Sequence, residues 1–472
     1  MIRFATALTA LSLVAAPAVA QPKDTGEAAF RALYKELVET NTTQSVGSCT
    51  LAAERMAARM KAAGFADSEL TVFVDPAFPK DGGLVAVLPG KDPKAKAVLL
   101  LAHIDVVEAK REDWTRDPFV LVEEDGYFYG RGAFDDKAQA AIWTDLLIRF
   151  RQEGYKPRRT LKVALTCGEE GGRLNGARWL ARNKRDLIDA AFALNEGAGG
   201  QLDAAGKPVS HTVLAAEKTF QNFIVEAVNG GGHSSRPTPD NAIYDLARAL
   251  DGVSRLEFPV QFNDANRGYF TRMATVIGGE EGAAMTRLVA NPADKEADAV
   301  LRRNPGYRSM MGTTCIPTLL EGGHASNALP QRARATVNCR IFPGVPAEEV
   351  RLALVKAIDD PKVTVTAQNA PGIGSAEPTA APRLTPQVMG PVEKVSAQMW
   401  PGVPVIPLLQ AGGTDARHLN EVGIPTYGIS GLFIDPDLGR IHGLNERIRV
   451  KALMEGREFS YRLVKLYAES KD

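Results

Sequence analysis

The sequence predicts an α/β protein with a central, mostly parallel sheet that is interrupted by a smaller α+β domain. Two observations predict this fold class. Up to about residue 215, apolar strand-like segments alternate with amphipathic helical segments, an order typical of a sheet covered by helices on both faces. From 215 to 370 strand-like segments alternate between apolar and polar residues, and after 371 the first pattern returns. We therefore expect 21–214 and 371–472 to form one domain and 215–370 to be inserted into it.

The first part of the chain begins with two segments that have apolar residues at helical spacing, 27–40 and 49–64, and Gly64 ends the second. The strand expected at 95–105 contains an apolar run without alternation at 97–102, which indicates a strand covered on both faces. A hairpin is expected to turn at Asp125-Gly126. The other expected elements are a strand at 83–90, a helix at 137–151, a strand at 160–166, a helix at 173–183 and a strand at 190–194.

The inserted part begins with the alternating segment 218–230. The elements expected after it are a helix at 241–250, strands at 313–320 and 333–342, a helix at 347–358 and a strand at 363–367. The stretch 372–386 is rich in Pro, Gly and Ala and predicts a linker back to the first domain.

Composition and the N-terminus limit the kind of protein. Lys+Arg and Asp+Glu both number 56, so no global basic field indicates nucleic acid as a partner. Arg3, the apolar run 7–16 and the small residues Ala18 and Ala20 predict a secretory signal peptide over 1–20, cleaved after Ala20. No later run approaches the ~20 apolar residues of a membrane span. The mature protein is expected to be secreted, or periplasmic in a Gram-negative bacterium.

The chain has four cysteines, Cys49, Cys167, Cys315 and Cys339, and their wide spacing does not fit a zinc ribbon. Cys315 and Cys339 are equally far from Asn327, the midpoint between two strands that could pair antiparallel. Opposite residues on such strands are close enough for a disulfide. A bond between these two cysteines and two separate thiols both remain open.

Five short segments carry acidic or histidine side chains, several of them just past the end of an expected strand. Open α/β sheets bind ligands at that edge. Each segment alone has an ordinary explanation, such as an N-cap for the Asp-Asp pair or a solvated Glu-Glu pair. Together they indicate a site. The segments are His103-Ile104-Asp105, Asp135-Asp136, Glu169-Glu170, Glu196 and His442.

The residue types in these segments suit a pair of metal ions. Two histidines and three carboxylates offer the nitrogen and oxygen ligands that Zn²⁺ accepts, with Co²⁺ or Mn²⁺ as alternatives. Paired metals polarise a carbonyl group and ionise a water. A further carboxylate that does not bind metal is needed to take the proton from that water and pass it to a leaving amine.

As a set, these motifs resemble the co-catalytic zinc peptidase and deacylase family, which includes aminoacylase, acetylornithine deacetylase, succinyl-diaminopimelate desuccinylase, glutamate carboxypeptidase and carnosinase. The resemblance covers roughly residues 27–468. It implies a zinc-peptidase-like α/β domain interrupted by a lid or dimerisation domain. It also implies a cis peptide bond between Asp135 and Asp136. Family members often have Asp where this chain has Glu196, and Glu is more like the aminoacylases and deacylases.

The resemblance also implies roles for the individual residues. His103 and Glu196 would bind the first metal, Asp135 would bridge both metals, and Glu170 and His442 would complete the second. Glu169 would be the general base and acid. Asp105 would accept a hydrogen bond from His103 and fix its ring.

For the inserted domain, the resemblance implies that His233 stabilises the oxyanion, often in the partner subunit's site. Asn327 and Arg340 match family positions near the substrate, and the Arg fork suits a carboxylate. Thr414 and Arg417 lie in a loop that resembles a substrate loop. The alternatives are that Arg340 is a surface cation and that 412–417 is a plain glycine-rich turn.

The expected activity is hydrolysis of amide bonds in small peptides, with N-acyl amino acids as the alternative substrates. The stretch 256–311 is longer than in the compact lids of the family, which puts the usual homodimer through the inserted domain in doubt. Two rival classes of protein predict different residues. A non-catalytic peptide-binding relative would have lost Glu169 or a ligand, and a serine esterase would need a G-x-S-x-G turn, which the chain lacks in a strand–turn–helix context.

Overall fold

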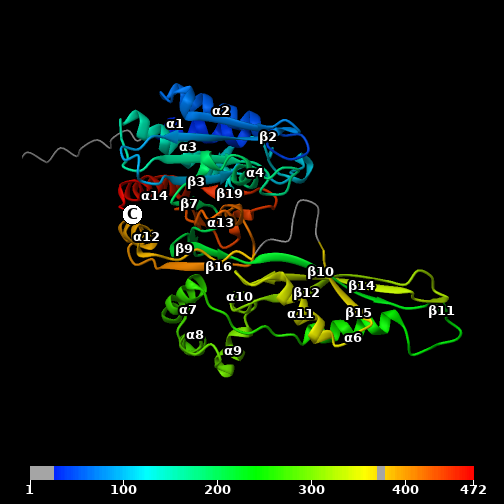
Figure 1. The fold of residues 1–472 in the computed structure, drawn as a ribbon. Coiled ribbons are helices and arrows are strands. Elements are labelled where there is room, and N and C mark those ends of the chain that lie inside the picture. Colours follow the sequence, from blue (N-terminus) through cyan, green and yellow to red (C-terminus); the bar gives the residue numbers. More distant parts are fainter. Residues whose placement is uncertain (1–25, 369–377, 472) are drawn as a thin grey trace, which may run out of the picture.

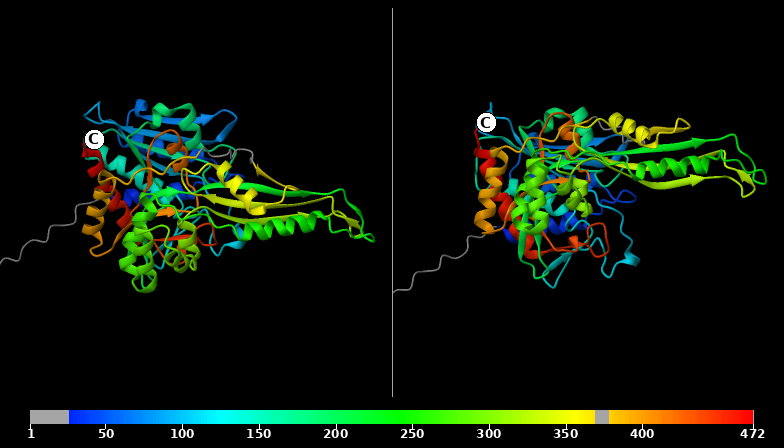
Figure 2. Two further views of the ribbon diagram at one scale, coloured as in Figure 1. Left: turned by 60° about the horizontal axis from the view of Figure 1, so that its bottom comes forward. Right: turned by 90° about the horizontal axis from the view of Figure 1, so that it is seen from below.

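The computed structural model describes residues 26–368 and 378–471. The expected signal peptide and residues 372–377 of the expected linker lie outside these ranges. The molecule has a compact main body, from which the inserted sheet and its two helices extend as an arm (Figures 1 and 2). No helix in the described ranges combines the length and the apolar character that crossing a membrane requires.

A ten-stranded sheet forms the centre of the main body, in the order β1-β2-β6-β3-β7-β17-β9-β8-β18, with β16 also paired to β9. The central neighbours β6, β3, β7 and β17 are all parallel to one another. The strands are β1 Leu70–Asp75, β2 Phe78–Leu88, β3 Val98–His103, β6 Leu161–Thr166, β7 Phe192–Asn195, β8 Gly200–Leu202, β9 Pro208–Glu217, β16 Val405–Gln410, β17 Thr426–Gly428 and β18 Phe433–Ile434.

Helices cover both faces of this sheet, as the sequence predicted. Every residue of β3 is buried because alternate side chains enter two different cores: Leu100 packs with one set of helices and Leu99 with the other. The helices of the first face are α1 Glu27–Glu39, α2 Cys49–Ala62, α3 Lys137–Gln152, α12 Pro386–Met399 and α14 Val450–Glu469. Those of the second face are α4 Gly176–Asn183, α5 Arg185–Ile188 and α13 Ala416–Glu421.

The predicted hairpin is present as β4 (Val122–Glu124) and β5 (Tyr127–Tyr129), and β19 (Arg447–Arg449) pairs with β5 as a third strand. Its turn residues Asp125 and Gly126 have φ values of 51° and 77°. Two successive residues at positive φ match the twist of a tight antiparallel hairpin, which is why an Asp-Gly pair predicted it.

The arm contains a four-stranded antiparallel sheet in the order β12-β14-β10-β15, with two helices that share its separate hydrophobic core. A two-stranded ribbon lies at its far end (Figure 1). The strands are β10 Thr219–Val228, β12 Thr314–Gly322, β14 Arg332–Ile341 and β15 Val363–Gln368, those of the ribbon are β11 Gly232–His233 and β13 Ala328–Leu329, and the helices are α6 Ala242–Ser254 and α11 Ala347–Ile358.

The chain between α6 and β12 forms four helices that pack on the main body. Phe270 and Met285 belong to the same hydrophobic core as the helices of the main sheet, whereas the arm has its own core. Arg272 fastens α7 to the body by a hydrogen bond to the Val405 carbonyl (2.6 Å) and an ion pair with Glu393 (2.7 Å). These helices are α7 Asp264–Ile277, α8 Gly279–Ala290, α9 Lys295–Arg302 and α10 Pro305–Met310.

The structure contains two disulfides, and no cysteine is free. Cys315 and Cys339 are bonded, and they are direct partners in the antiparallel β12–β14 register, which confirms the predicted pair. Cys49 and Cys167 are also bonded, across 118 residues. The sequence did not predict this second bond because nothing in the local spacing relates the start of α2 to the loop after β6.

Candidate active site

Three of the predicted segments follow neighbouring parallel strands. His103 is the last residue of β3, Glu169 and Glu170 follow β6, and Glu196 comes directly after β7. Since β6, β3 and β7 are adjacent and parallel, their C-terminal ends meet at one edge of the sheet. The turn after Cys167 requires Gly168, whose φ is +90° and where a Cβ atom would lie 2.0 Å from the Leu174 carbonyl oxygen.

Asp135 lies between two histidines that come from distant parts of the chain. Its Oδ1 is 3.1 Å from His103 Nε2, and its Oδ2 is 3.1 Å from His442 Nε2. Glu196 Oε1 lies 3.9 Å from His103 Nε2, and Glu170 Oε1 lies 2.9 Å from His442 Nε2. The five predicted ligands therefore meet at one place.

These side chains form two groups of potential metal ligands that share Asp135: His103, Asp135 and Glu196 in one, and Asp135, Glu170 and His442 in the other. Within each group the ligand atoms all lie within 4.8 Å of one another. One imidazole nitrogen and two carboxylates per group form a donor set that suits a divalent metal ion such as Zn²⁺. The residues present thus fit two ions with one bridging carboxylate.

The carboxylates of the site are buried close together, so their negative charges are stable only with cations beside them. Burial raises the pKa of Glu196 well above its ordinary value, and the nearby Asp136 and Asp135 raise it further. Burial also acts to raise the pKa of Asp135, but hydrogen bonds with His103 and His442 lower it overall. Several carboxylates in one poorly solvated place are stable together only with cations among them.

Binding of metal ions is expected to become tighter as the pH rises. Hydrogen bonds to Asp135 and Glu170 raise the pKa of His442 to about 10, so its ring is protonated at neutral pH until a metal displaces the proton. Each displaced proton should strengthen the apparent affinity by about tenfold per pH unit. Calorimetric titration of the metal-free protein with Zn²⁺, in buffers of different ionisation enthalpy, measures the released protons. An affinity that does not change from about pH 6 to about pH 8 would contradict this.

Asp105 lies beside His103 as expected, but its contacts differ from those that the resemblance implied. His103 Nδ1 is 3.1 Å from the main-chain carbonyl oxygen of Asp105 and 3.5 Å from the carboxylate Oδ1. The carboxylate instead accepts the backbone N–H groups of Glu169 (3.4 Å) and Glu170 (3.1 Å). Asp105 therefore orients the ring through its main chain and holds the Glu169-Glu170 turn through its side chain.

Glu169 belongs to neither of the two ligand groups that share Asp135, and it lines a cavity between the main body and the arm. Burial raises the pKa of Glu169 to about 8. A carboxylate that holds protons more strongly than usual is suited to accept one and return it. The peptide bond between Asp135 and Asp136 is cis, as the resemblance implied.

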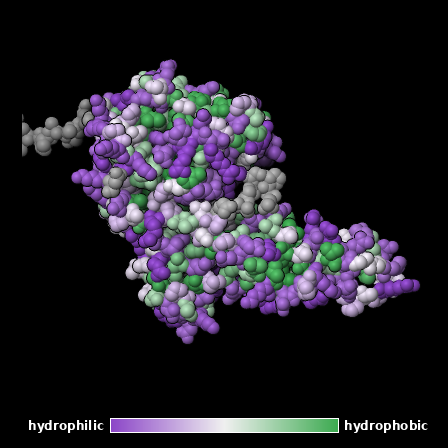
Figure 3. Space-filling model, in the orientation of Figure 1, coloured by the Kyte–Doolittle hydropathy of each residue, from purple (hydrophilic) through white to green (hydrophobic). Residues whose placement is uncertain are grey.

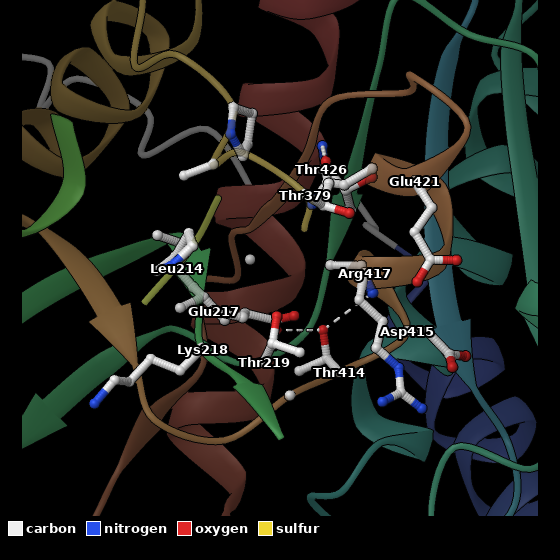
Figure 4. Close-up of a pocket in the computed structure, with 18 of the residues that line it drawn as sticks. Leu214, Glu217, Lys218, Thr219, Thr379, Thr414, Asp415, Arg417, Glu421 and Thr426 are labelled. Atoms are coloured by element: carbon white, nitrogen blue, oxygen red, sulfur yellow. Dashed lines mark hydrogen bonds between the residues drawn. The ribbon is translucent and has the colours of Figure 1, made fainter. Parts of the chain in front are cut away.

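The cavity beside Glu169 has a volume of ≈ 180 Å³ and lies between the main body and the near end of the arm (Figure 4). Arg340, Thr414 and Arg417 line it, as expected for substrate-binding residues. The Arg340 guanidinium lies over the Phe220 ring, 5.0 Å from its centre, and donates to the Ala411 carbonyl oxygen at 3.2 Å. Within the described ranges, no carboxylate pairs with Arg340.

Thr414 and Arg417 also have polar partners within the protein. The Thr414 hydroxyl donates to Glu217 at 2.6 Å, which Figure 4 shows, and accepts from the Asn195 amide at 2.9 Å. Arg417 is exposed, and its Nε donates to His418 Nε2 at 3.2 Å. The Thr414 hydroxyl is therefore already engaged within the protein, and the residue contributes to the wall of the cavity.

His233 and Asn327 lie at the opposite end of the arm from Arg340. In the β10–β14 pairing, Phe220 is opposite Arg340 near the body, whereas the far end leads to the ribbon that carries His233 (Figure 1). Both residues are exposed, and the Ser234 N–H donates to the Asn327 carbonyl oxygen at 3.0 Å. The expectation that these two residues join Arg340 around one substrate is therefore wrong within a single chain, because ten residues of extended strand separate them.

One buried residue of the site was not predicted. Glu446 is 1% exposed and accepts hydrogen bonds from the backbone of the Asp135 loop. The sequence contains only a weak indication of this residue, which is that an acidic side chain lies four positions after the candidate ligand His442.

The fold and the site together define a metal-dependent hydrolase with a carboxylate-bridged pair of ligand groups. Residues 99–466 match the profile of "Peptidase family M20/M25/M40". The chain therefore belongs to this family, whose members hydrolyse peptide and amide bonds.

Two kinds of curated relative are similar over most of the chain. The "N-fatty-acyl-amino acid synthase/hydrolase PM20D1" of Xenopus tropicalis is 30% identical, over 77% of this chain and 71% of the relative. The human protein of the same name is 29% identical, over 80% of this chain and 75% of the relative. Aminoacylase-1A of Rattus norvegicus is 27% identical, over 81% of this chain and 83% of the relative.

Solved structures share the fold at lower identity. An M20 family metallo-carboxypeptidase from Sulfolobus solfataricus has a TM-score of 0.64 at 18% identity, covering 93% of this chain and 99% of that chain. Human carnosine dipeptidase 1 has a TM-score of 0.61 at 17% identity, covering 94% of this chain and 98% of that chain. The predicted fold class, with its interrupted catalytic domain, is confirmed.

Proposed function

We propose that the protein hydrolyses N-acyl amino acids at a pair of Zn²⁺ ions, with Co²⁺ or Mn²⁺ as alternatives. The observation that carries this proposal is the position of Asp135 between two ligand groups, beside a carboxylate that faces a cavity. When bound, the two ions polarise the amide carbonyl and favour ionisation of a water. Analysis of the metal content of the protein tests which ion it carries, and fewer than two ions per chain after loading would overturn the proposal.

The chain's own residues supply the remaining chemistry. Glu169 accepts the proton of the attacking water and returns it to the amine that leaves, which is why it must lie near the ions without binding them. Asp105 holds Glu169 and Glu170 in place through their backbone N–H groups. Arg340 receives the carboxylate beside the scissile amide, because its planar fork can donate two hydrogen bonds to it.

The charges of the cavity favour N-acyl amino acids over dipeptides. A dipeptide has a free ammonium group, which would need an ionised carboxylate as partner. Glu217 is the candidate, because its Oε2 has no hydrogen-bond partner within the described ranges. However, burial raises the pKa of Glu217, which favours the neutral form. Arg340, by contrast, lines the cavity and pairs with no carboxylate among the described residues. The names of the relatives agree with an acyl amino acid substrate.

Small peptides remain the second candidate, because members of the family hydrolyse peptide bonds and the carboxylates of Asp415 and Glu421 also line the cavity. A screen of the metal-loaded enzyme on N-acyl amino acids of increasing chain length and on dipeptides of the same amino acid separates the two. Higher kcat/KM for the dipeptides would overturn the preferred substrate class while leaving the amide hydrolase in place.

Replacing Arg340 by Ala is expected to remove the preference for a free carboxylate. Wild type should cleave an N-acyl amino acid with a kcat/KM about 10–100-fold above that for its amide, since a charged hydrogen bond contributes about 1.5–3 kcal/mol. In Arg340→Ala the two substrates should become similar. Arg334→Ala is the control, since Arg334 lies six residues earlier on the same face of β14 in an exposed ion pair with Glu321. Equal rates on both substrates in the wild type would rule out carboxylate recognition.

We further propose that two copies of the chain pair through their arms, and that His233 stabilises the oxyanion in the site of the partner subunit. His233 is exposed at the far end of its own arm, so its own metal centre lacks it. The edge strand β12 exposes Ile316, Leu319 and Leu320 by 63%, 64% and 68%. Figure 3 shows hydrophobic side chains gathered on the arm. An edge strand with such side chains offers both unpaired backbone groups and apolar area to a second copy.

This pairing predicts a dimer in solution that charge on β12 disrupts. The double variant Leu319→Asp/Leu320→Asp should sediment as a monomer and lose most of its activity. The separate variant His233→Ala should also lose most of its activity. The control is Val276→Asp, which changes an exposed residue of α7 on the main body. A wild-type monomer with full activity would contradict both the dimer and the role of His233.

The proposed location is outside the cytoplasm, with the mature chain starting at Gln21. The disulfides Cys49–Cys167 and Cys315–Cys339 support this, because such bonds persist in oxidising compartments. The mass of the protein recovered from its natural host tests it. A chain that retains residues 1–20 would contradict the predicted cleavage.

A further inference from the structure

Glu446 occupies a buried position behind the metal-ligand groups, where its carboxylate meets four donors. Oε2 accepts from Arg131 Nη1 at 2.7 Å and from the Gly132 N–H at 3.0 Å. Oε1 accepts from the Phe134 N–H at 2.9 Å and the Asp135 N–H at 3.1 Å. The carboxylate therefore has both oxygens fully engaged.

The backbone that Glu446 holds is the loop that delivers the bridging ligand. One of the four bonds goes to the N–H group of Asp135 itself. Gly132, at φ +78°, turns the loop under Val106, where a Cβ atom would come within 2.6 Å of Val106 Cγ1. Without the carboxylate, three backbone N–H groups would need other partners, since unpaired buried donors destabilise a conformation. The position of Asp135 thus depends on Glu446.

The same residues join this loop to the one that carries His442. Glu446 is four positions after His442, and its own carbonyl oxygen accepts the Gly130 N–H at 3.1 Å. Arg131 Nη2 donates to the Gly443 carbonyl oxygen at 2.9 Å. His442 has a φ of 59°, a left-handed conformation that residues other than glycine seldom adopt. A loop with such a backbone needs contacts of this kind to keep its shape.

We infer that Glu446 is a positioning residue for the metal centre, and that its ion pair with Arg131 sets the distance between Asp135 and His442. The inference rests on the proposed two-metal function. Arg131 is 2% exposed and lies over the Trp114 ring, 5.1 Å from its centre, so water does not replace the pair. The ion held by Asp135, Glu170 and His442 depends on both loops. The ion held by His103, Asp135 and Glu196 depends on the Asp135 loop alone, because His103 ends β3 and Glu196 directly follows β7.

Glu446→Gln tests this with little change in volume. An amide offers one acceptor oxygen where the carboxylate offers two, and its NH₂ group would face either Arg131 or the N–H groups of Phe134 and Asp135. Titration of the metal-free variant with Zn²⁺ should show the site of Asp135, Glu170 and His442 weakened about 10–100-fold, the size of effect that partners of metal ligands have. The site of His103, Asp135 and Glu196 should weaken less, because it depends on the Asp135 loop but not on the His442 loop. Turnover should recover when Zn²⁺ is raised in proportion.

The control is Asp145→Asn, which removes the charge from another buried carboxylate paired with an arginine. Asp145 on α3 pairs with Arg457 on α14 at 2.7 Å, away from the ligand groups. Asp145→Asn should lower the melting temperature, as Glu446→Gln is also expected to do. The Asp145→Asn protein should nevertheless bind both ions with wild-type affinity. Equal weakening of zinc binding in both variants, or unchanged binding in Glu446→Gln, would overturn the inference.

Arg131→Lys provides a second variant, should Glu446→Gln fail to fold. It keeps a cation beside Glu446 but shortens the side chain and removes the fork that also reaches the Gly443 carbonyl. The same pattern is expected, with the site of Asp135, Glu170 and His442 weakened more than the other, and two sites of wild-type affinity would overturn the inference. The proposed function has a separate readout. If wild-type protein binds fewer than two ions, the two-metal function fails, whereas two normal ions in Arg131→Lys or Glu446→Gln refute only the positioning role.

Discussion

Glu169→Gln is expected to bind two metal ions and to lose turnover by about 10²–10⁴-fold. The amide has nearly the size of the carboxylate but cannot accept a proton from the attacking water. Glu169 belongs to neither ligand group among the described residues, so the ions should stay. The measurements are kcat on an N-acyl amino acid and the metal content of the same sample.

Comparing the change in kcat with the change in KM shows whether Glu169 acts in the reaction itself. A residue that transfers a proton only during the reaction should change kcat much more than KM. Glu153→Gln makes the same chemical change at the surface, where Glu153 pairs with Lys465 at 3.4 Å, and should leave kcat unchanged. If Glu169→Gln retained wild-type turnover, the general base would have to be another group.

Asp135→Asn is expected to abolish the binding of metal ions when zinc is supplied in stoichiometric amounts. It is also expected to abolish activity. The two carboxylate oxygens of Asp135 face different histidines, and an amide offers only one oxygen that can bind a metal. The polarisation that metal ions provide contributes several kcal/mol, so kcat/KM should fall on the order of 10³-fold or more. Calorimetry with Zn²⁺ and the rate on the same substrate measure the two losses.

Asp136→Asn is the matched control, because Asp136 is adjacent to Asp135 but belongs to neither ligand group in the described part of the chain. Burial raises its pKa well above the ordinary value, so an uncharged side chain is already favoured there. This variant should still bind two ions. Two ions bound to Asp135→Asn at wild-type affinity would refute the bridging role, whatever its activity.

The candidate ligands could be predicted from the sequence because they follow expected strands and because, as a set, they resemble the motifs of a known family. An apolar strand that ends in His103 or is followed by Glu196 marks the C-terminal edge of a parallel sheet. Glu169 follows β6 in the same way, directly before Glu170, which belongs to one of the two groups of potential ligands. The Cys315–Cys339 bond could also be proposed from the sequence, because two antiparallel strands bring together residues that are equally far from the midpoint between them.

Other features depend on contacts that no local pattern contains. The Cys49–Cys167 bond and the Glu446 carboxylate join segments 118 and more than 300 residues apart. The helices at 264–310 follow α6 of the arm in sequence but share the core of the main body. Which of two available hydrophobic surfaces a helix covers depends on the shape of both, and the spacing of its apolar residues is the same in either case.

The sequence by itself predicted the α/β class, its interruption by a smaller domain, and the five candidate metal ligands that the structure brings together. Only the tertiary structure decided that Asp105 holds the Glu169-Glu170 turn with its carboxylate, and that His233 lies at the opposite end of the arm from Arg340. The physical reason is the range of the interactions. Periodicity and strand ends reflect the backbone within one element, whereas hydrogen-bond partners and distances across the molecule are fixed when separate elements pack together.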